Sequence, residues 1–266
     1  MKNKIKTLFL IIVFSTVFSC SGDKQEDIII LDSRTLEDVN EDFKNLDIQP
    51  GINDVSLESL VAGVYWNFRI IVPSDASETN KRPLVMALHG ASGGSTTAHQ
   101  TTGCYIEPGL EALNAFIISP NAGTEQWYSI SNQIQVINLL TLAKSNFNID
   151  DSKVLVTGYS NGGNASWLYA DFFPQYFTAA IAMASSYNPR RADGSISKIN
   201  IPLYVIHSNA DELFPIGITE GFVNDSRGAG SDIEFVIADG LSHYAPCDYV
   251  SYLQDAVTWL QNQIWI

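Results

Sequence analysis

The sequence predicts a single α/β domain, in which a mostly parallel central sheet is covered by helices on both faces. Apolar, strand-like runs alternate with helix-like segments, an order typical of right-handed strand–helix–strand units. Most of the strand-like runs are continuously apolar, as expected of strands buried on both faces. One of them ends in a Gly-x-Ser-x-Gly motif that leads into a helix-like segment. The predicted strands are 67–72, 84–88, 115–119, 153–157, 179–184, 203–207 and 234–238, and the predicted helices are 129–146, 164–173 and 248–263.

The Gly-x-Ser-x-Gly motif consists of Gly158, Ser160 and Gly162. Between a strand and a helix, it is typical of a nucleophile elbow, a tight turn that holds a serine in a strained backbone conformation. Side chains at positions 158 and 162 would collide in such a turn, and Gly163 would let the helix pack close to the sheet. An incidental serine in a Gly-rich turn is the alternative, so the interpretation depends on finding a base and an acid.

Two residues later in the chain fit the roles of base and acid. His243 follows the last predicted strand, where it would lie at the carboxyl edge of the sheet and take the proton of Ser160. Asp211 follows the preceding strand, and a carboxylate there would fix the tautomer of His243 and stabilise its cation. Glu212 and Asp239 are competing acids, of which the first is expected to point away and the second to come too early on the final loop.

The apolar run 83–88 is followed by a Gly-rich loop that includes Gly90. In a fold with a nucleophile elbow, this loop supplies one backbone N–H to the oxyanion hole, and the residue after the nucleophile supplies the other. We therefore predict Ala91 and Asn161 as the two donors, with Gly90 or Ser92 as alternatives to Ala91. Each donor would stabilise a tetrahedral oxyanion by about 3 kcal/mol.

Three further histidines and two aromatic residues have both functional and structural interpretations. His89 is expected to brace the oxyanion loop, His207 to pack in the core and His99 to lie at the surface. Trp127 and Tyr159 are predicted to contact substrate, because aromatic rings stack on acyl or sugar groups. Core packing would explain either ring equally well.

The N-terminal region predicts export and attachment to a membrane. Residues 1–19 combine lysines with an apolar run too short to span a bilayer, which is typical of a secretory signal. The end of this segment resembles a bacterial lipobox and predicts Cys20 as the lipid-modified first residue of the mature chain, with an uncleaved anchor as the alternative. Residues 20–50 are rich in Asp and Glu and are predicted to be a flexible tether, and residues 51–266 to be the catalytic domain.

Composition limits the partners and the redox state of the protein. A formal net charge of −14 argues against nucleic acid or anionic lipid as a partner, because both require basic patches. Besides Cys20, the chain contains Cys104 and Cys247, which can form a disulfide in an exported protein. Two buried free thiols are the alternative. The sequence does not define an oligomeric state.

From about residue 64 onward, the chain resembles exported α/β-hydrolase esterases of the polyhydroxybutyrate depolymerase and feruloyl esterase type. The segments that carry the resemblance are 83–90, 150–163, 173–177 and 201–215. The order Ser160, Asp211, His243 is also that of α/β-hydrolases. The resemblance implies the α/β-hydrolase fold and ester hydrolysis through an acyl-enzyme, without a metal or cofactor. The segment between residues 185 and 200 is too short for a sizeable lid domain, so an open site is expected.

Together these features lead to the hypothesis of an exported, lipid-anchored serine esterase with Ser160 as its nucleophile. The resemblance and the expected export favour acyl or feruloyl esters on polysaccharides as substrates. A serine peptidase of the prolyl-oligopeptidase type is one alternative, and a glycan-binding lipoprotein without catalytic activity is another.

Overall fold

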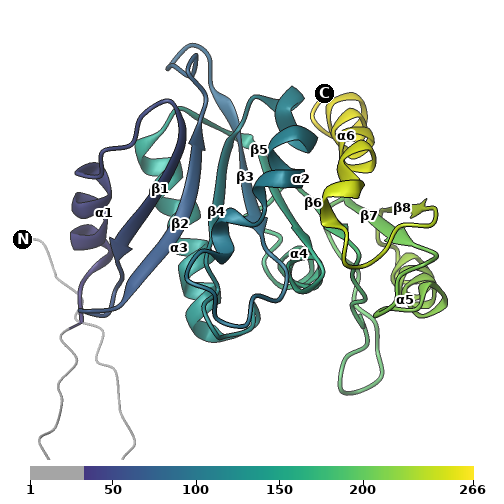
Figure 1. Cartoon of the computed structure of the whole chain (residues 1–266). Coiled ribbons are helices and arrows are strands. Elements are labelled where there is room, and N and C mark those ends of the chain that lie inside the picture. Colours follow the sequence, from purple (N-terminus) through teal and green to yellow (C-terminus); the bar gives the residue numbers. More distant parts are fainter. Residues whose placement is uncertain (1–32) are drawn as a thin grey trace, which may run out of the picture. The chain divides into compact units, whose positions relative to one another are not determined.

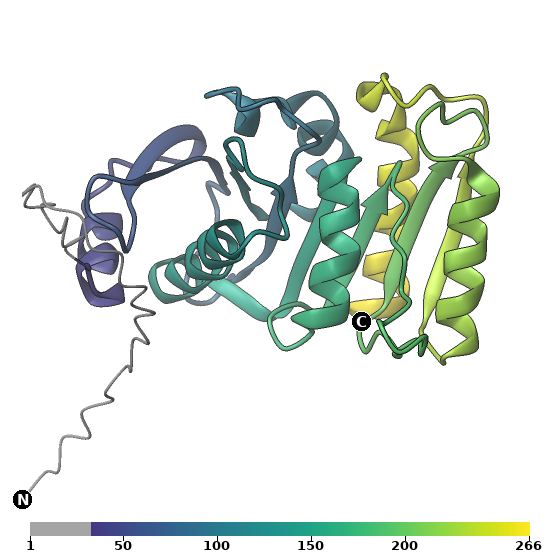
Figure 2. The ribbon, with the colours of Figure 1, turned by 90° about the horizontal axis from the view of Figure 1, so that it is seen from below.

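Residues 33–266 are described by the computed structural model, and they form one sheet with helices on both faces (Figures 1 and 2). The strands are β1 Gly51–Glu58, β2 Tyr65–Val72, β3 Arg82–Leu88, β4 Phe116–Pro120, β5 Ile149–Tyr159, β6 Ala179–Met183, β7 Leu203–Ser208 and β8 Ile233–Ala238. The α-helices are α1 Leu36–Lys44, α2 Gly103–Leu110, α3 Ile130–Asn146, α4 Asn161–Phe172, α5 Ile216–Gly228 and α6 Val250–Trp259. Shorter helical segments are η1 Ala98–Gln100, η2 Glu111–Leu113, η3 Pro246–Tyr249 and the π-helical η4 Leu260–Ile264.

The sheet has the strand order β1-β2-β4-β3-β5-β6-β7-β8. β2 pairs antiparallel with both of its neighbours, β1 and β4. All other neighbouring strands pair in parallel, so the carboxyl ends of β3 to β8 lie at the same edge of the sheet. The predicted α/β class with a mostly parallel sheet is confirmed, and each predicted strand overlaps an observed one.

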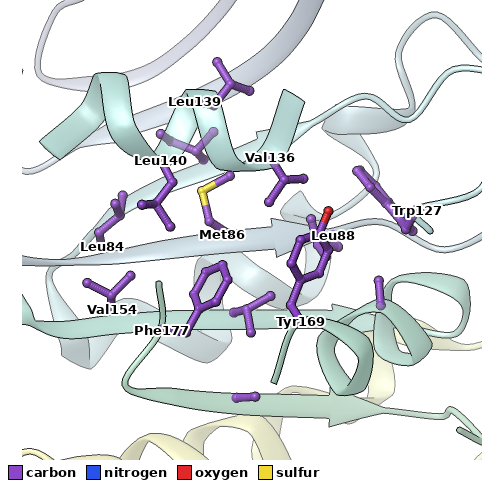
Figure 3. Packing of buried hydrophobic residues seen from close by; sticks show 14 of the residues in the cluster. Leu84, Met86, Leu88, Trp127, Val136, Leu139, Leu140, Val154, Tyr169 and Phe177 are labelled. Carbon is purple, nitrogen blue, oxygen red and sulfur yellow. The ribbon is translucent and has the colours of Figure 1, made fainter. Parts of the chain in front are cut away.

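Alternate residues of the central strands supply two hydrophobic cores, one on each face of the sheet. Leu84 and Met86 of β3 belong to the core that includes α1, α3 and α4, whereas Val85 and Ala87 belong to the core that includes α2 and α6. Figure 3 shows side chains of α3, among them Leu140, packing onto β3 in the first of these cores. Burial on both faces is thus the reason why the strands are apolar at every position.

The predicted tether is wrong in its second half, because residues 33–50 belong to the folded domain. Thr35 begins α1 with a capping box, and the helix buries Val39 and Phe43 in the core. Residues four apart share one face of a helix, so the acidic residues between these two lie on the side away from the core. An acid-rich composition therefore concealed an amphipathic helix.

Three further elements are not predicted by the sequence patterns, namely β1, α2 and α5. β1 is an edge strand that buries Leu57 but leaves most of its other side chains in contact with solvent, so its apolar signal is weak. α2 contains Pro108 and Gly109, both of which are unfavourable inside a helix. These elements are held by packing against the sheet and not by a strong local preference.

The predicted signal at residues 1–19, the lipidation site Cys20 and the tether up to residue 32 lie outside the described residues. Within residues 33–266, no helix has the length and apolar character needed to cross a membrane. The link between β6 and β7, residues 184–202, contains no helix, as expected of a fold without a sizeable lid there.

Replacement of Phe43 tests whether α1 is part of the domain. Phe43 is 2% exposed, and its ring lies 6.4 Å from that of Phe68 and 5.8 Å from that of Phe147, centroid to centroid. We expect Phe43→Ala to lower the free energy of unfolding in urea by about 3–5 kcal/mol, the usual cost of deleting a buried aromatic ring. Glu37→Gln, at an exposed residue on the opposite side of α1, is the control and should change it by less than about 0.5 kcal/mol. A similarly small effect of both variants would contradict the folded helix.

Candidate active site

Ser160 lies at the tip of the turn between β5 and α4, with φ 56° and ψ −116°. A β-carbon on Gly162 would lie 1.9 Å from the carbonyl oxygen of Leu88, and one on Gly158 would lie 2.4 Å from the backbone of Gly162. A β-carbon on Gly163 would lie 2.5 Å from a backbone oxygen of β6. The steric reasons given for the three glycines are therefore confirmed, and the strained serine is held by close backbone packing on both sides.

His243 connects the serine to a carboxylate. Its Nε2 lies 2.9 Å from the Oγ of Ser160, and its Nδ1 lies 2.8 Å from Oδ2 of Asp211. The other carboxylate oxygen accepts the backbone N–H groups of Leu213 and Phe214, at 2.9 and 2.7 Å. Because the carboxylate accepts from Nδ1, the proton of the neutral imidazole lies on Nδ1, and Nε2 is left to accept the serine proton.

The parallel sheet explains why three residues far apart in sequence meet. Ser160 follows β5, Asp211 follows β7 and His243 follows β8, so all three lie beyond the carboxyl ends of parallel strands. The structure therefore brings the predicted nucleophile, base and acid together. The side chain of Asp211 is fully buried and His243 is 5% exposed, so the hydrogen bond between them is shielded from water, whereas Ser160 lies at the wall of a cavity.

The backbone of His243 is held at both of its polar groups. Glu212 accepts its N–H at 2.7 Å and also accepts the hydroxyl of Ser242 at 2.7 Å. Tyr159 donates its hydroxyl to the carbonyl oxygen of His243 at 2.7 Å. Burial raises the pKa of Tyr159, so this hydroxyl stays protonated and donates. These two contacts hold the backbone of His243 in place and so help to position its imidazole.

One sequence prediction is wrong at this point, and a second is confirmed only in part. Glu212 does not point away but holds the loop of His243, a role that its place beside Asp211 in the sequence did not reveal. Tyr159 lines the cavity that contains Ser160, as predicted, but it is 5% exposed and packs among the rings of Tyr105, Tyr249 and His243, so its stacking on substrate stays a prediction. It also acts as a support for the base.

His89 braces the loop after β3, as predicted. Its Nε2 accepts the backbone N–H of Ala122 at 3.1 Å, so its proton lies on Nδ1 and is donated to the carbonyl of Gly90 at 2.6 Å. Burial lowers the pKa of His89, which keeps the ring neutral, as this pair of bonds requires. Trp127 donates its indole N–H to the carbonyl of His89 at 2.9 Å and is 1% exposed. The indole therefore holds this loop, and because Trp127 also lines a second cavity, its contact with substrate stays a prediction.

The predicted oxyanion donors flank the serine. Ala91 lies in the wall of the cavity that contains Ser160, together with Gly90 and Ser92. Asn161 is the first residue of α4, where backbone N–H groups have no acceptor within the helix. Both positions agree with the predicted role, and the choice among the three loop residues stays a prediction.

The cavity over Ser160 has a volume of about 370 Å³. Tyr244 and Leu213 line it and are 70% and 49% exposed, which makes them candidate substrate contacts that the sequence patterns did not indicate. A larger hollow of about 470 Å³ lies beside β1 and α2, away from these residues. We identify the smaller one, the nucleophile cavity, as the candidate active site, because it contains the serine and the imidazole.

A disulfide joins Cys104 of α2 to Cys247 of η3, with the two Cα atoms 5.3 Å apart. The alternative of two free thiols is therefore not what the structure shows. Tyr105 and Pro246, the neighbours of these cysteines, both line the nucleophile cavity. The bond thus ties the loop that carries His243 to the opposite wall, and bonds that close long loops typically stabilise a protein by about 2–4 kcal/mol.

The remaining histidines and the second competing acid are structural. His207 is buried as predicted and bonds the carbonyl of Phe214 at 2.8 Å, which shapes the loop of the acid. His99 is only 5% exposed, so the prediction of a surface position is wrong. Its Nε2 lies 3.8 Å from a carboxylate oxygen of Asp54 in β1, the strand that pairs antiparallel with β2. Asp239 accepts the amide of Asn209 instead of His243.

Comparison with known proteins agrees with this geometry. An acetylxylan esterase/xylanase of Neocallimastix patriciarum, described as bifunctional, is 22% identical over 180 residues, which are 66% of this chain and 25% of that protein. This chain spans less than half the length of the curated relatives it matches. Among solved structures, a thermostable esterase has a TM-score of 0.66 at 22% identity, over 79% of this chain and 62% of the other. Est1E from Butyrivibrio proteoclasticus has a TM-score of 0.61 at 15% identity, over 80% and 99%.

The fold and the serine at its elbow define an α/β-hydrolase, as predicted. The dienelactone hydrolase family matches residues 120–257, just over half of the chain, and the chain therefore belongs to this family. Membership of this hydrolase family agrees with the prediction of a serine ester hydrolase. The match includes all three residues of the hydrogen-bonded chain.

The support from Glu212 predicts a pH-dependent stability. Hydrogen bonds from the His243 backbone and the Ser242 hydroxyl lower the pKa of Glu212 below its ordinary value. Because its pKa is lowered in the folded state, the ionised carboxylate stabilises the fold at pH values above the ordinary pKa of a glutamate. This contribution is lost as the pH falls through the lowered pKa. We expect Glu212→Gln to lower the Tm at pH 7, with a difference from the natural protein that shrinks below about pH 4.3.

Thermal unfolding followed by circular dichroism between pH 3 and pH 7 measures this difference. Glu220→Gln, an exposed position on α5, is the matched control and should leave the Tm nearly unchanged throughout. A Tm difference for Glu212→Gln that stays constant down to pH 3 would contradict the role assigned to the ionised carboxylate.

Proposed function

We propose that this protein hydrolyses carboxylic esters through an acyl-enzyme on Ser160. The observation that carries the proposal is the continuous chain of hydrogen bonds from Asp211 through His243 to Ser160, at the wall of an open cavity. Membership of a hydrolase family supports the same conclusion.

In the proposed reaction, Nε2 of His243 takes the proton of Ser160 while Oγ attacks the ester carbonyl carbon. The carbonyl oxygen becomes an oxyanion, stabilised by the backbone N–H of Asn161 and of a residue in the Ala91 loop. His243 then gives its proton to the leaving alcohol as the tetrahedral intermediate collapses to the acyl-enzyme. A water molecule, deprotonated by the same imidazole, attacks the acyl carbon, and the imidazolium returns the proton to Oγ of Ser160 as the acid is released. Asp211 stays ionised and stabilises the imidazolium in both half-reactions.

Acyl or feruloyl esters on polysaccharides are the substrates we propose. The name of the Neocallimastix relative includes an acetylxylan esterase activity, which supports a polymer-linked ester. The rim of the nucleophile cavity carries the exposed side chains of Tyr244 and Leu213, which can contact a bulky substrate. The link between β6 and β7 contains no helix, so no lid domain inserted there would limit the access of a polymer.

A serine peptidase of the prolyl-oligopeptidase type, in the form that recognises a free N-terminus, is less well supported. Such an enzyme requires a carboxylate to bind the substrate ammonium group, and none of the described residues that line the nucleophile cavity is acidic. Glu212, the nearest acid after Asp211, is occupied by the backbone of His243 and by Ser242. A purely glycan-binding role would not need this hydrogen-bonded chain, which supports catalysis over binding alone.

Export and a lipid anchor at Cys20 are also part of the proposal, on the evidence of the charged and apolar pattern of residues 1–19. A disulfide between Cys104 and Cys247 supports an oxidising compartment outside the cytoplasm. The substrate would then be met on the outer side of the membrane to which the protein is attached.

Hydrolysis of p-nitrophenyl acetate tests the esterase proposal. We expect Ser160→Ala to lower kcat by about 10⁴-fold or more, because the nucleophile is lost, and Asp211→Asn to cause a loss of about 10⁴-fold through the wrong imidazole tautomer. Ser145→Ala, an exposed serine on α3, is the control and should keep full activity. Residual activity of Ser160→Ala near that of the natural protein, or cleavage of aminoacyl anilides without cleavage of esters, would rule the proposal out.

Expression in a bacterial host with labelled palmitate tests the anchor. The natural chain should enter the membrane fraction and carry label, because acyl chains on Cys20 bury their methylene groups in the bilayer. Cys20→Ser should carry no label, and Cys104→Ser, at a cysteine inside the domain, is the control that should remain labelled. Label on neither the natural chain nor the control, with an intact N-terminus by mass spectrometry, would favour the uncleaved anchor.

A further inference from the structure

A second cavity, of about 270 Å³, adjoins the nucleophile elbow on the side of α4. Asn161 lies in its wall, and the preceding residue is the nucleophile Ser160, so the cavity is next to the nucleophile. The wall is completed by the segment before α3, which contributes Trp127 and Tyr128, and by the link between β6 and β7, which contributes Ser186 and Asn188. We call it the elbow cavity.

The lining of the elbow cavity is uncharged and mostly apolar, with a few polar side chains among the aromatic and aliphatic ones. Asn164 uses its Oδ1 to accept the backbone N–H of Ser186 at 2.8 Å, and Asn188 uses its Oδ1 to accept that of Arg190 at 3.0 Å. Their amide NH₂ groups keep donors for a ligand. Leu168 supplies an apolar patch, and none of the described lining residues is charged, although the chain as a whole carries a formal charge of −14.

Tyr128 is the exposed aromatic ring at this cavity. It is 64% exposed, and only its backbone carbonyl is used, as the acceptor of a hydrogen bond from Gln133 at 2.7 Å. Ile130, 75% exposed, lies two residues further along. An exposed ring beside amide donors is the combination that lets a protein stack on the C–H face of a ligand and bond its hydroxyl groups.

The far wall is held rigidly in place. Tyr187 donates its hydroxyl to Asp171 at 2.7 Å and stacks on Trp167, with ring centroids 5.8 Å apart. Arg191 donates to the other oxygen of the same carboxylate at 2.5 Å, and the side chain of Asp171 is 2% exposed. These contacts tie the link between β6 and β7 to α4, so the cavity is formed before any ligand arrives.

We propose that the elbow cavity binds a neutral sugar residue of the ester substrate. This inference rests on the proposed esterase function and assigns the alcohol side of the ester to this cavity. A sugar offers hydroxyl groups to the amides of Asn164 and Asn188 and an apolar ring face to Tyr128. An acidic sugar would need a cation, which the described lining lacks, whereas a neutral sugar can use the apolar surface and the neutral amide donors together.

Substitutions in the elbow cavity test the inference through a ratio of two substrates. We measure kcat/KM for acetylated xylo-oligosaccharides and for p-nitrophenyl acetate, which carries no sugar. Tyr128→Ala and Asn188→Ala should each lower the ratio of the first to the second by about tenfold, the effect of losing one stacking or polar contact. Tyr128→Phe, which keeps the ring, should restore most of the ratio. Tyr65→Ala, an exposed tyrosine on β2, is the matched control and should leave the ratio unchanged.

Binding to the inactive Ser160→Ala protein gives a readout besides activity. Isothermal titration with acetylated xylotetraose should show binding that Tyr128→Ala weakens. Turnover of p-nitrophenyl acetate with an unchanged ratio in both cavity variants overturns the sugar subsite but leaves the esterase intact. If the cavity variants instead lower kcat/KM for methyl ferulate relative to p-nitrophenyl acetate, and leave the ratio for the oligosaccharide unchanged, the cavity binds an aromatic acid. That result also overturns the sugar subsite. No turnover of either ester by the natural protein would mean that the esterase proposal itself has failed.

Discussion

The close approach of the nucleophile turn to the neighbouring strand is the constraint on which the site depends. With no side chain at Gly162, the first turn of α4 lies against the carbonyl of Leu88, and Ser160 is forced to a positive φ. This places the hydroxyl at the edge of the sheet, beside the N-terminus of a helix, where negative charge is favoured. The same packing sets the distance between Asn161 and the loop after β3, and so the geometry of any oxyanion that forms there.

The base depends on a second set of contacts, which act on its backbone. An imidazole on a surface loop would sample many positions, but the N–H and carbonyl of His243 are both bonded, to Glu212 and Tyr159. The disulfide fixes the same loop four residues further along, at Cys247. Preorganisation of this kind matters because a group held in place does not have to be ordered during the reaction.

Much of the fold could be predicted because its signals are local. Strands buried on both faces are apolar at every position, and a nucleophile elbow requires glycines at fixed spacing around Ser160. His243 and Asp211 could be assigned because each follows a recognisable strand in the expected order. The signal failed where an element depends on one or two buried residues, as in α1, where Phe43 and Val39 are surrounded by acids, and in β1, an edge strand.

The sequence by itself determined the class of fold and the identity of the serine, histidine and aspartate, since periodicity and motif spacing express steric rules that hold within a few residues. Only the tertiary structure decided the roles of the aromatic and acidic residues around them. Whether Trp127 and Tyr159 support a loop, and whether Glu212 points away or bonds His243, depends on which distant backbone atoms come within hydrogen-bond distance. Those distances arise from the packing of whole strands and helices, which no single segment encodes.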